Sequence, residues 1–172
     1  MGGLVASKFL ANSAANRSKT IAVFTLGTPF GGSAKTIQAL ETGNMITFTG
    51  VIPLYTNLVK SVGRNSFAAY QLLPTTSYYT MTGYYPINYN GTNITNVYSI
   101  LSNRSWGKTS SGSTKTMFSA ATSFHNSLGH GTNHITITGG VPVYTIAGAG
   151  IPTIATYNYG EGYVIDDATE VT

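Results

Sequence analysis

The sequence predicts an α/β fold in which a mostly parallel sheet is flanked by helices. Two runs of β-branched and other apolar residues, 20–26 and 141–147, are typical of strands covered on both faces. Segments 3–15, 33–40 and 115–128 carry apolar residues at helical spacing. With 172 residues, 42% of them hydrophobic, the chain is long enough for one domain with a substantial core.

The two N-terminal helices are expected from local signals. Small residues between 3 and 15 would let a short helix pack closely on the sheet, and Asn16 is a plausible stop. Ser33 can cap a second helix that runs to about Leu40, and Gly43 is well placed to end it.

The middle of the chain is expected to cover the sheet. Residues 45–63 form an apolar segment interrupted by Pro53, which we interpret as a lid with hydrophobic side chains toward a substrate. Residues 77–112 are rich in Tyr, Asn, Gly, Ser and Thr, which favours a loop-rich insertion with short strands. Residues 152–159 are expected to form an edge or hairpin strand.

Charged residues make up only 8% of the chain, which is typical of an extracytoplasmic surface. All nine Lys and Arg lie before residue 116, whereas four of the five acids crowd the end of the chain (Glu161, Asp166, Asp167 and Glu170). The cations form no run or stripe, so we expect no nucleic-acid partner.

Several classes of site are not expected. The chain has no cysteine, and His130 and His134 have no Cys or carboxylate beside them, so we predict neither a metal site nor a cofactor. No stretch is long and apolar enough to span a membrane. A signal peptide, if the protein is secreted, would lie upstream of residue 1.

The first residues match the second half of the motif Gly-x-Ser-x-Gly, in which a strand turns sharply into a helix. Met1 and Gly2 would supply its last two positions, so the nucleophilic serine is expected immediately before Met1. A start methionine followed by flexible glycines is the alternative. Ser7 and Ser33 are better explained as a packing residue and a helix cap.

Four further strings follow in order: Leu-Gly-Thr-Pro-Phe-Gly-Gly-Ser at 26–33, Tyr-Gln-Leu-Leu-Pro at 70–74, Phe-His-Asn-Ser-Leu at 124–128, and the run at 141–150. In order and spacing they resemble lipases of the lecithin:cholesterol acyltransferase-like branch of the α/β-hydrolases. The resemblance implies a single partial α/β-hydrolase fold over residues 1–172, with about 45–112 as the cap.

The same resemblance implies a fragment of a serine acyl hydrolase, either a lipase or esterase or an acyltransferase, that acts on fatty acyl esters. Its substrate would be a lipid or another ester. It assigns the oxyanion and elbow positions to Met1, Gly2 and Gly3. It assigns the substrate pocket to Thr28, Pro29 and Phe30, in the loop at the mouth of the active site.

None of the histidines is expected to be the catalytic base. The triad order in this superfamily is Ser, acid, His, yet only Glu41 precedes the histidines, and it lies inside a predicted helix. The resemblance places His125 in a helix at the rear of the fold.

The acid of the triad is expected either in the acidic tail or beyond Thr172. Asp166 and Asp167 lie near the right place but lack the Gly-Asp-Gly turn that the family uses there, so solvated tail charges are the simpler interpretation.

Without a complete triad, the chain is expected to be inactive by itself. Exposed sheet edges would favour a homo-oligomer, and the composition favours an extracellular or cell-envelope location. A non-catalytic module is the alternative function, either a β-rich extracellular surface module such as an adhesin or a carbohydrate-binding module whose aromatic side chains stack on sugars.

Overall fold

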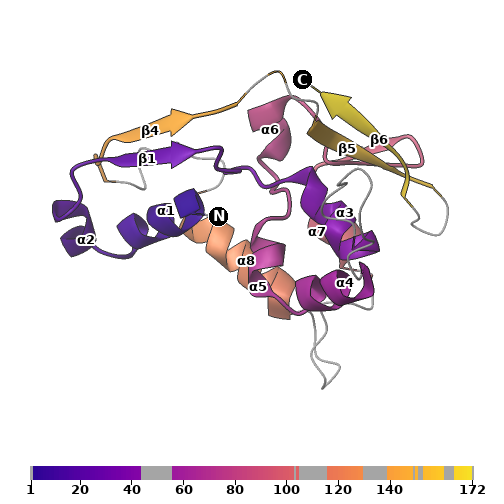
Figure 1. Cartoon of the computed structure of the whole chain (residues 1–172), viewed down its shortest axis with the longest axis horizontal. Helices are drawn as coiled ribbons and strands as arrows, with labels where there is room; N and C mark the ends of the chain where they lie inside the picture. The colour runs from indigo at the N-terminus through magenta and orange to yellow at the C-terminus, as the bar shows by residue number, and fades with distance from the viewer. Residues whose placement is uncertain are drawn as a thin grey trace.

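The computed structural model describes residues 2–43, 56–102, 104, 116–129, 139–148, 150, 153–160 and 165–171. Two groups of elements lie side by side in it. Helices α1 and α2 pack under a ribbon of β1 and β4 at one end, and the remaining helices gather with β5 and β6 at the other (Figure 1).

The N-terminal segment forms two helices rather than the single one predicted for 3–15. These are α1 (Gly2–Asn12) and α2 (Ala14–Ser18). The break falls at Ser13, whose extended backbone and side-chain oxygen cap α2 by accepting a hydrogen bond from the Asn16 N–H at 3.1 Å.

The two apolar runs form strands as predicted, and β1 (Val23–Leu26) pairs in parallel with β4 (Val143–Ile146). The prediction that both strands are covered on both faces is wrong. Phe24 and Leu26 are 66% and 73% exposed, and their register partners Tyr144 and Ile146 are exposed as well. Helix α1 packs on one face of this ribbon, and the residues that the structure describes leave its other face open.

The second sheet has the strand order β3-β2-β5-β6, formed by β2 (Ile87–Tyr89), β3 (Thr92–Ile94), β5 (Thr153–Tyr159) and β6 (Ile165–Val171). Only β2 and β5 run parallel in it, because β2–β3 and β5–β6 pair antiparallel. The second sheet is therefore small and mixed, and the mostly parallel sheet that we predicted is not confirmed. Pairing of β5 with β6 bears out the expected hairpin strand.

Six further helices complete the described part of the chain: α3 (Ala34–Thr42), α4 (Thr56–Arg64), α5 (Phe67–Gln71), α6 (Tyr78–Thr82), α7 (Val97–Leu101) and α8 (Thr116–Ser127). The predicted helices 33–40 and 115–128 are confirmed as α3 and α8. Gly43 ends α3 with φ 81°, whereas Ser33 stands at its N-terminus without a side-chain capping bond. Helices α6 and α7 lie where we expected mainly loop.

The core joins α3, α5, α7 and α8 to the second sheet, and buried tyrosines contribute much of it. Their hydroxyls find partners inside the fold. Tyr78 donates to the Ala155 carbonyl at 3.1 Å, and Tyr157 donates to the Gln38 side chain at 3.2 Å. A tyrosine-rich sequence with few charges can therefore fill a core with most of these polar tips satisfied. Among the described residues, the buried Tyr98 hydroxyl is an exception without a hydrogen-bond partner.

One carboxylate ties three parts of the core together. Glu41, near the end of α3, lies 2.8 Å from Arg104 Nε and 3.9 Å from Arg64 Nη2, and the Tyr159 hydroxyl approaches it at 3.5 Å. Burial raises the pKa of Glu41, against the opposing effect of the two guanidinium groups.

The loop between β1 and α3 is fixed by its contact with the segment after α5. Ser33 N donates to the Leu72 carbonyl at 2.8 Å, and Thr75 N donates to the Gly31 carbonyl at 2.9 Å. Gly32 has φ 92°, and a Cβ there would lie 2.6 Å from the Pro74 Cα. Only glycine permits both the backbone conformation and this approach.

Gly32→Ala should therefore destabilise the fold much more than a glycine replacement at an open turn. Gly91 is the matched control, because its φ is 79° but a Cβ there meets nothing within 4 Å. We expect a loss of about 1 kcal/mol for Gly91→Ala and about 3 kcal/mol or more for Gly32→Ala, measured by urea unfolding. Equal losses would show that the contact with Pro74 is unimportant.

Buried His125 should make the fold sensitive to acid. Burial lowers its pKa to about 4, although a hydrogen bond with the Gln71 backbone opposes that effect. Because the folded pKa lies below the unfolded value of about 6.5, the unfolded state takes up the proton first. The stability present above pH 6.5 should fall as the pH drops toward 4, whereas His125→Gln should lose this part of the pH dependence. Denaturant unfolding at pH 8, 6 and 5 tests this, and an unchanged dependence in the variant would contradict it.

Candidate functional site

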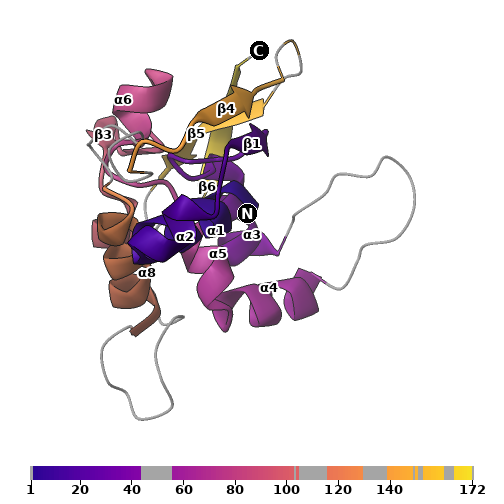
Figure 2. The ribbon, with the colours of Figure 1, turned by 90° about the vertical axis from the view of Figure 1, so that its left-hand side faces the viewer.

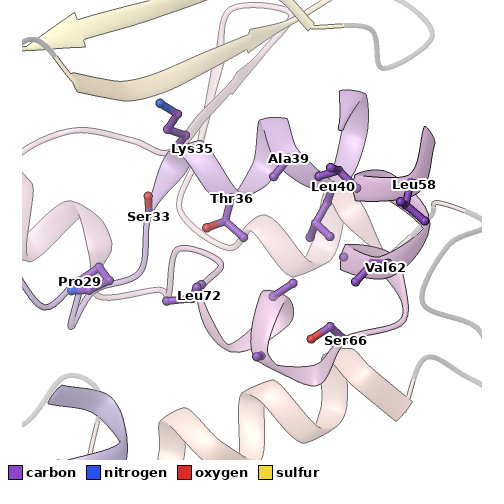
Figure 3. A pocket seen from close by; sticks show the side chains of 14 residues that line it. Pro29, Ser33, Lys35, Thr36, Ala39, Leu40, Leu58, Val62, Ser66 and Leu72 are labelled. Carbon is purple, nitrogen blue, oxygen red and sulfur yellow. The ribbon is translucent and has the colours of Figure 1, made fainter. Parts of the chain in front are cut away.

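A hollow of about 670 Å³ lies between α3, α4 and α5 and extends to the loop before α3 (Figure 3). Its walls are mainly apolar, with polar side chains on α3, in the loop before α3 and at the start of α5. The apolar lining is Pro29, Ala39, Leu40, Leu58, Val59, Val62, Gly63, Ala68, Ala69 and Leu72, and the polar lining is Ser33, Lys35, Thr36 and Ser66. We call this hollow the α3–α5 groove. Its volume and lining suit an apolar ligand.

Small residues keep the groove open where its walls approach one another. Ala39, Ala68 and Ala69 present only methyl groups. Gly63 lets α4 approach α3, since a Cβ there would lie 3.3 Å from Leu40 Cδ2. A larger side chain at any of these positions would occupy space that a ligand could use.

Arg64 holds α4 against α3. Its Nε donates to the Leu40 carbonyl at 2.7 Å, near the end of α3. Its ion pair with Glu41 adds a second contact, so the wall formed by α4 depends on the same carboxylate that binds Arg104. No residue of α4 is itself buried. The polar contacts of Arg64 therefore hold this helix where a packed apolar face would hold others.

The other end of the groove lies beside the start of α1. Gly3 is buried, and a Cβ there would lie 2.8 Å from the Thr28 Cβ, which is too close for any side chain. Pro29, the next residue, lines the groove. The first turn of α1 thus contacts Thr28, which is next in the chain to Pro29 of the groove wall.

The predicted site residues are placed as follows. Met1 lies outside the described residues, Gly2 begins α1, and Gly3 contacts the loop through Thr28. Thr28, Pro29 and Phe30 are half-buried in that loop, but only Pro29 is part of the groove lining.

Some of the groove-lining residues lie in segments that the sequence analysis singled out, and others do not. Leu58 and Val59 belong to the predicted lid segment 45–63, where we expected hydrophobic side chains toward a substrate. Ala68 and Ala69 were missed, because an alanine that lines a groove carries no signal that separates it from one in a core. Residues 44–55 of the lid segment lie outside the described part of the chain.

Those titratable residues singled out in the sequence that the structure describes do not line the groove. His125 is buried on α8 and hydrogen-bonded with the Gln71 backbone, and Asp166 and Asp167 belong to β6. His130, His134 and Glu161 fall outside the described ranges. Within those ranges there is no group of three His, Cys, Asp or Glu side chains placed to hold a metal ion. None of the described helices is long and apolar enough to span a bilayer.

Comparison with known proteins supports the resemblance in the sequence. No curated protein and no solved structure matches the chain. The sequence model of the lecithin:cholesterol acyltransferase family matches residues 1–135, well over half of the chain. The matched part contains α1, the glycine-rich loop at 27–33 and every residue that lines the groove. The chain therefore belongs to the lecithin:cholesterol acyltransferase family.

Proposed function

We propose that this chain carries the acyl-binding part of a serine acyl hydrolase or acyltransferase that acts on fatty acyl esters. The family comprises acyltransferase and lipase-like enzymes with lipid substrates. The α3–α5 groove supplies what such a substrate needs, because its lining is mostly methyl and methylene groups. No finding supports the alternative of a carbohydrate-binding module.

The contact of Gly3 with Thr28 carries this proposal. It brings the N-terminal turn of α1 against Thr28, which is followed in the chain by the groove-lining residue Pro29. In the elbow interpretation the nucleophilic serine precedes this turn, and the N–H of residue 1 is one oxyanion donor. An ester carbonyl at the start of α1 would then have its acyl chain directed along the groove.

The chemistry that follows is acyl transfer through a covalent intermediate. The serine oxygen would attack the ester carbonyl, and the alcohol would leave as the acyl-enzyme forms. Water or a second alcohol would then take the acyl group. The groove contributes binding that grows with chain length, since each buried methylene adds about 0.8 kcal/mol.

Two further expectations accompany this function. Members of the family are typically secreted, and the low charge content of this chain is in keeping with an extracellular or cell-envelope location. The exposed face and outer edges of the β1–β4 ribbon favour self-association, which we propose as a homo-oligomer.

The 172-residue chain by itself should not turn over esters. The elbow interpretation puts the nucleophile before Met1, and the pKa of buried His125 is lowered to about 4 within the core rather than at the groove. We expect p-nitrophenyl ester hydrolysis at the buffer rate and no labelling by a serine-directed fluorophosphonate. Turnover that the fluorophosphonate abolishes would contradict this expectation.

Acyl binding can be measured without catalysis. A fluorescent fatty acid at monomeric concentration should bind to the chain, and Ala68→Phe should weaken it at least about tenfold, equivalent to about 1.4 kcal/mol, by filling the groove. Ala15→Phe is the matched control, because Ala15 is exposed on α2. Equal affinity in both variants, with unchanged circular dichroism, would exclude the groove as the acyl site.

A further inference from the structure

We propose that Tyr79 and Tyr85 form a site of oxidative cross-linking, at which a one-electron oxidant, such as a haem peroxidase with hydrogen peroxide, joins the two rings covalently. This inference goes beyond the proposed function and does not depend on it. The two rings are stacked, with centroids 4.2 Å apart and planes 22° from parallel. Among the residues that the structure describes, this is the one stacked pair in which both rings are phenols, since the other joins Phe24 to Tyr144.

The stack brings the ring carbons that would react close to each other. Hydrogen bonding with the Tyr79 side chain raises the pKa of Tyr85, so the hydroxyl ends of the two rings lie together. In nearly parallel rings with their hydroxyls at the same end, the carbons next to each C–O bond face their counterparts. Those carbons share the unpaired electron of a phenoxyl radical, and two such radicals couple there.

A hydrogen-bonded turn holds the two tyrosines in this arrangement. Gly83 ends α6 with φ 78°, and its N–H donates to the Tyr79 carbonyl at 2.7 Å. The Thr82 hydroxyl donates to the Tyr78 carbonyl at 2.8 Å and accepts from the Tyr84 N–H at 3.2 Å. Because the turn is already formed, the two radicals would meet without a search through backbone conformations.

Both rings are open to an oxidant from solution. Tyr79 is 41% exposed, and Tyr85 is half-buried beside it. Figure 2 shows α6 at the upper edge of the molecule, on the opposite side from α4 and its wall of the groove. The chain has no cysteine, so no thiol competes for the oxidant. Members of the family are typically secreted, and extracellular surroundings are oxidising.

The reaction balances as a removal of two hydrogen atoms. Each phenol gives up one electron and one proton, and the two phenoxyl radicals form a C–C bond between the ring carbons next to their oxygens. The hydrogen on each of these carbons then moves to oxygen, which restores both phenols. The oxidant takes up two electrons and two protons in total, so that one hydrogen peroxide becomes two waters.

The cross-link would stiffen the support of the glycine-rich loop. Helix α6 lies against this loop, because a Cβ on Gly31 would be 2.9 Å from Met81 Sδ and 3.6 Å from Tyr78 Cα. A bond between Tyr79 and Tyr85 would tie α6 to the segment that enters β2. Oxidation would therefore fix a part of the fold that the loop contacts, without filling the groove.

The test is treatment of the full chain, at low protein concentration, with a haem peroxidase and hydrogen peroxide. Dityrosine fluorescence, denaturing gel electrophoresis and peptide mapping by mass spectrometry follow the product. We expect a monomeric product that has lost two hydrogen atoms, with the cross-link between Tyr79 and Tyr85. Tyr79→Phe and Tyr85→Phe should each abolish this product, although phenylalanine keeps a ring in the stack. Tyr84→Phe is the matched control, because Tyr84 lies in the same turn, is also 41% exposed and stands outside the stack.

Several results would overturn the proposal. These are a cross-link that survives in Tyr79→Phe, one that is lost in Tyr84→Phe, and one that forms only between chains. Oxidation confined to Met81, which would add oxygen as a sulfoxide and leave both tyrosines unchanged, would also contradict it. A small photochemical one-electron oxidant removes any limit set by the size of the peroxidase, so unreacted tyrosines under both treatments would count against the site as well.

Discussion

The close contact between the glycine-rich loop at 27–33 and the segment that follows α5 sets the geometry of the rest of the molecule. Gly32 allows the loop to meet the Pro74 backbone, and two backbone hydrogen bonds hold the segments together. Because α3 begins directly after this loop and α5 ends directly before its partner, the contact fixes two walls of the groove. The position of α4 then follows from its attachment to α3 through Arg64.

The four sequence strings, of which the family match covers the first three, are linked by contacts in space. The loop at 27–33 packs on the string at 70–74, and the Gln71 backbone is hydrogen-bonded with His125 of the string at 124–128. Strand β4 carries the fourth string and pairs with β1. These strings therefore serve mainly to hold segments of the fold together. Most of the residues that line the groove stand between them, on α3, α4 and α5, whereas Pro29, Ser33 and Leu72 belong to the strings themselves.

The parts of the fold that follow from neighbours in sequence could be predicted, and those that depend on distant partners could not. Helices α3 and α8 carry their own periodicity, and Gly43 ends α3 as expected. The pairing of β2 with β5, and the exposure of Phe24 and Leu26, depend on which segments lie alongside. In the candidate site, Gly3 was singled out through its motif and its role stays a prediction, whereas the small residues of the groove could be recognised only from the helices they face.

The attachment of α4 has a consequence for how the groove would respond to heat and to engineering. Since α4 buries no residue of its own, the wall it forms can loosen while the tyrosine-rich core stays intact. Functional lifetime at high temperature would then be limited by this one helix rather than by global melting. Gains in durability would come from new contacts between α4 and α3, and improvements to the core would add little.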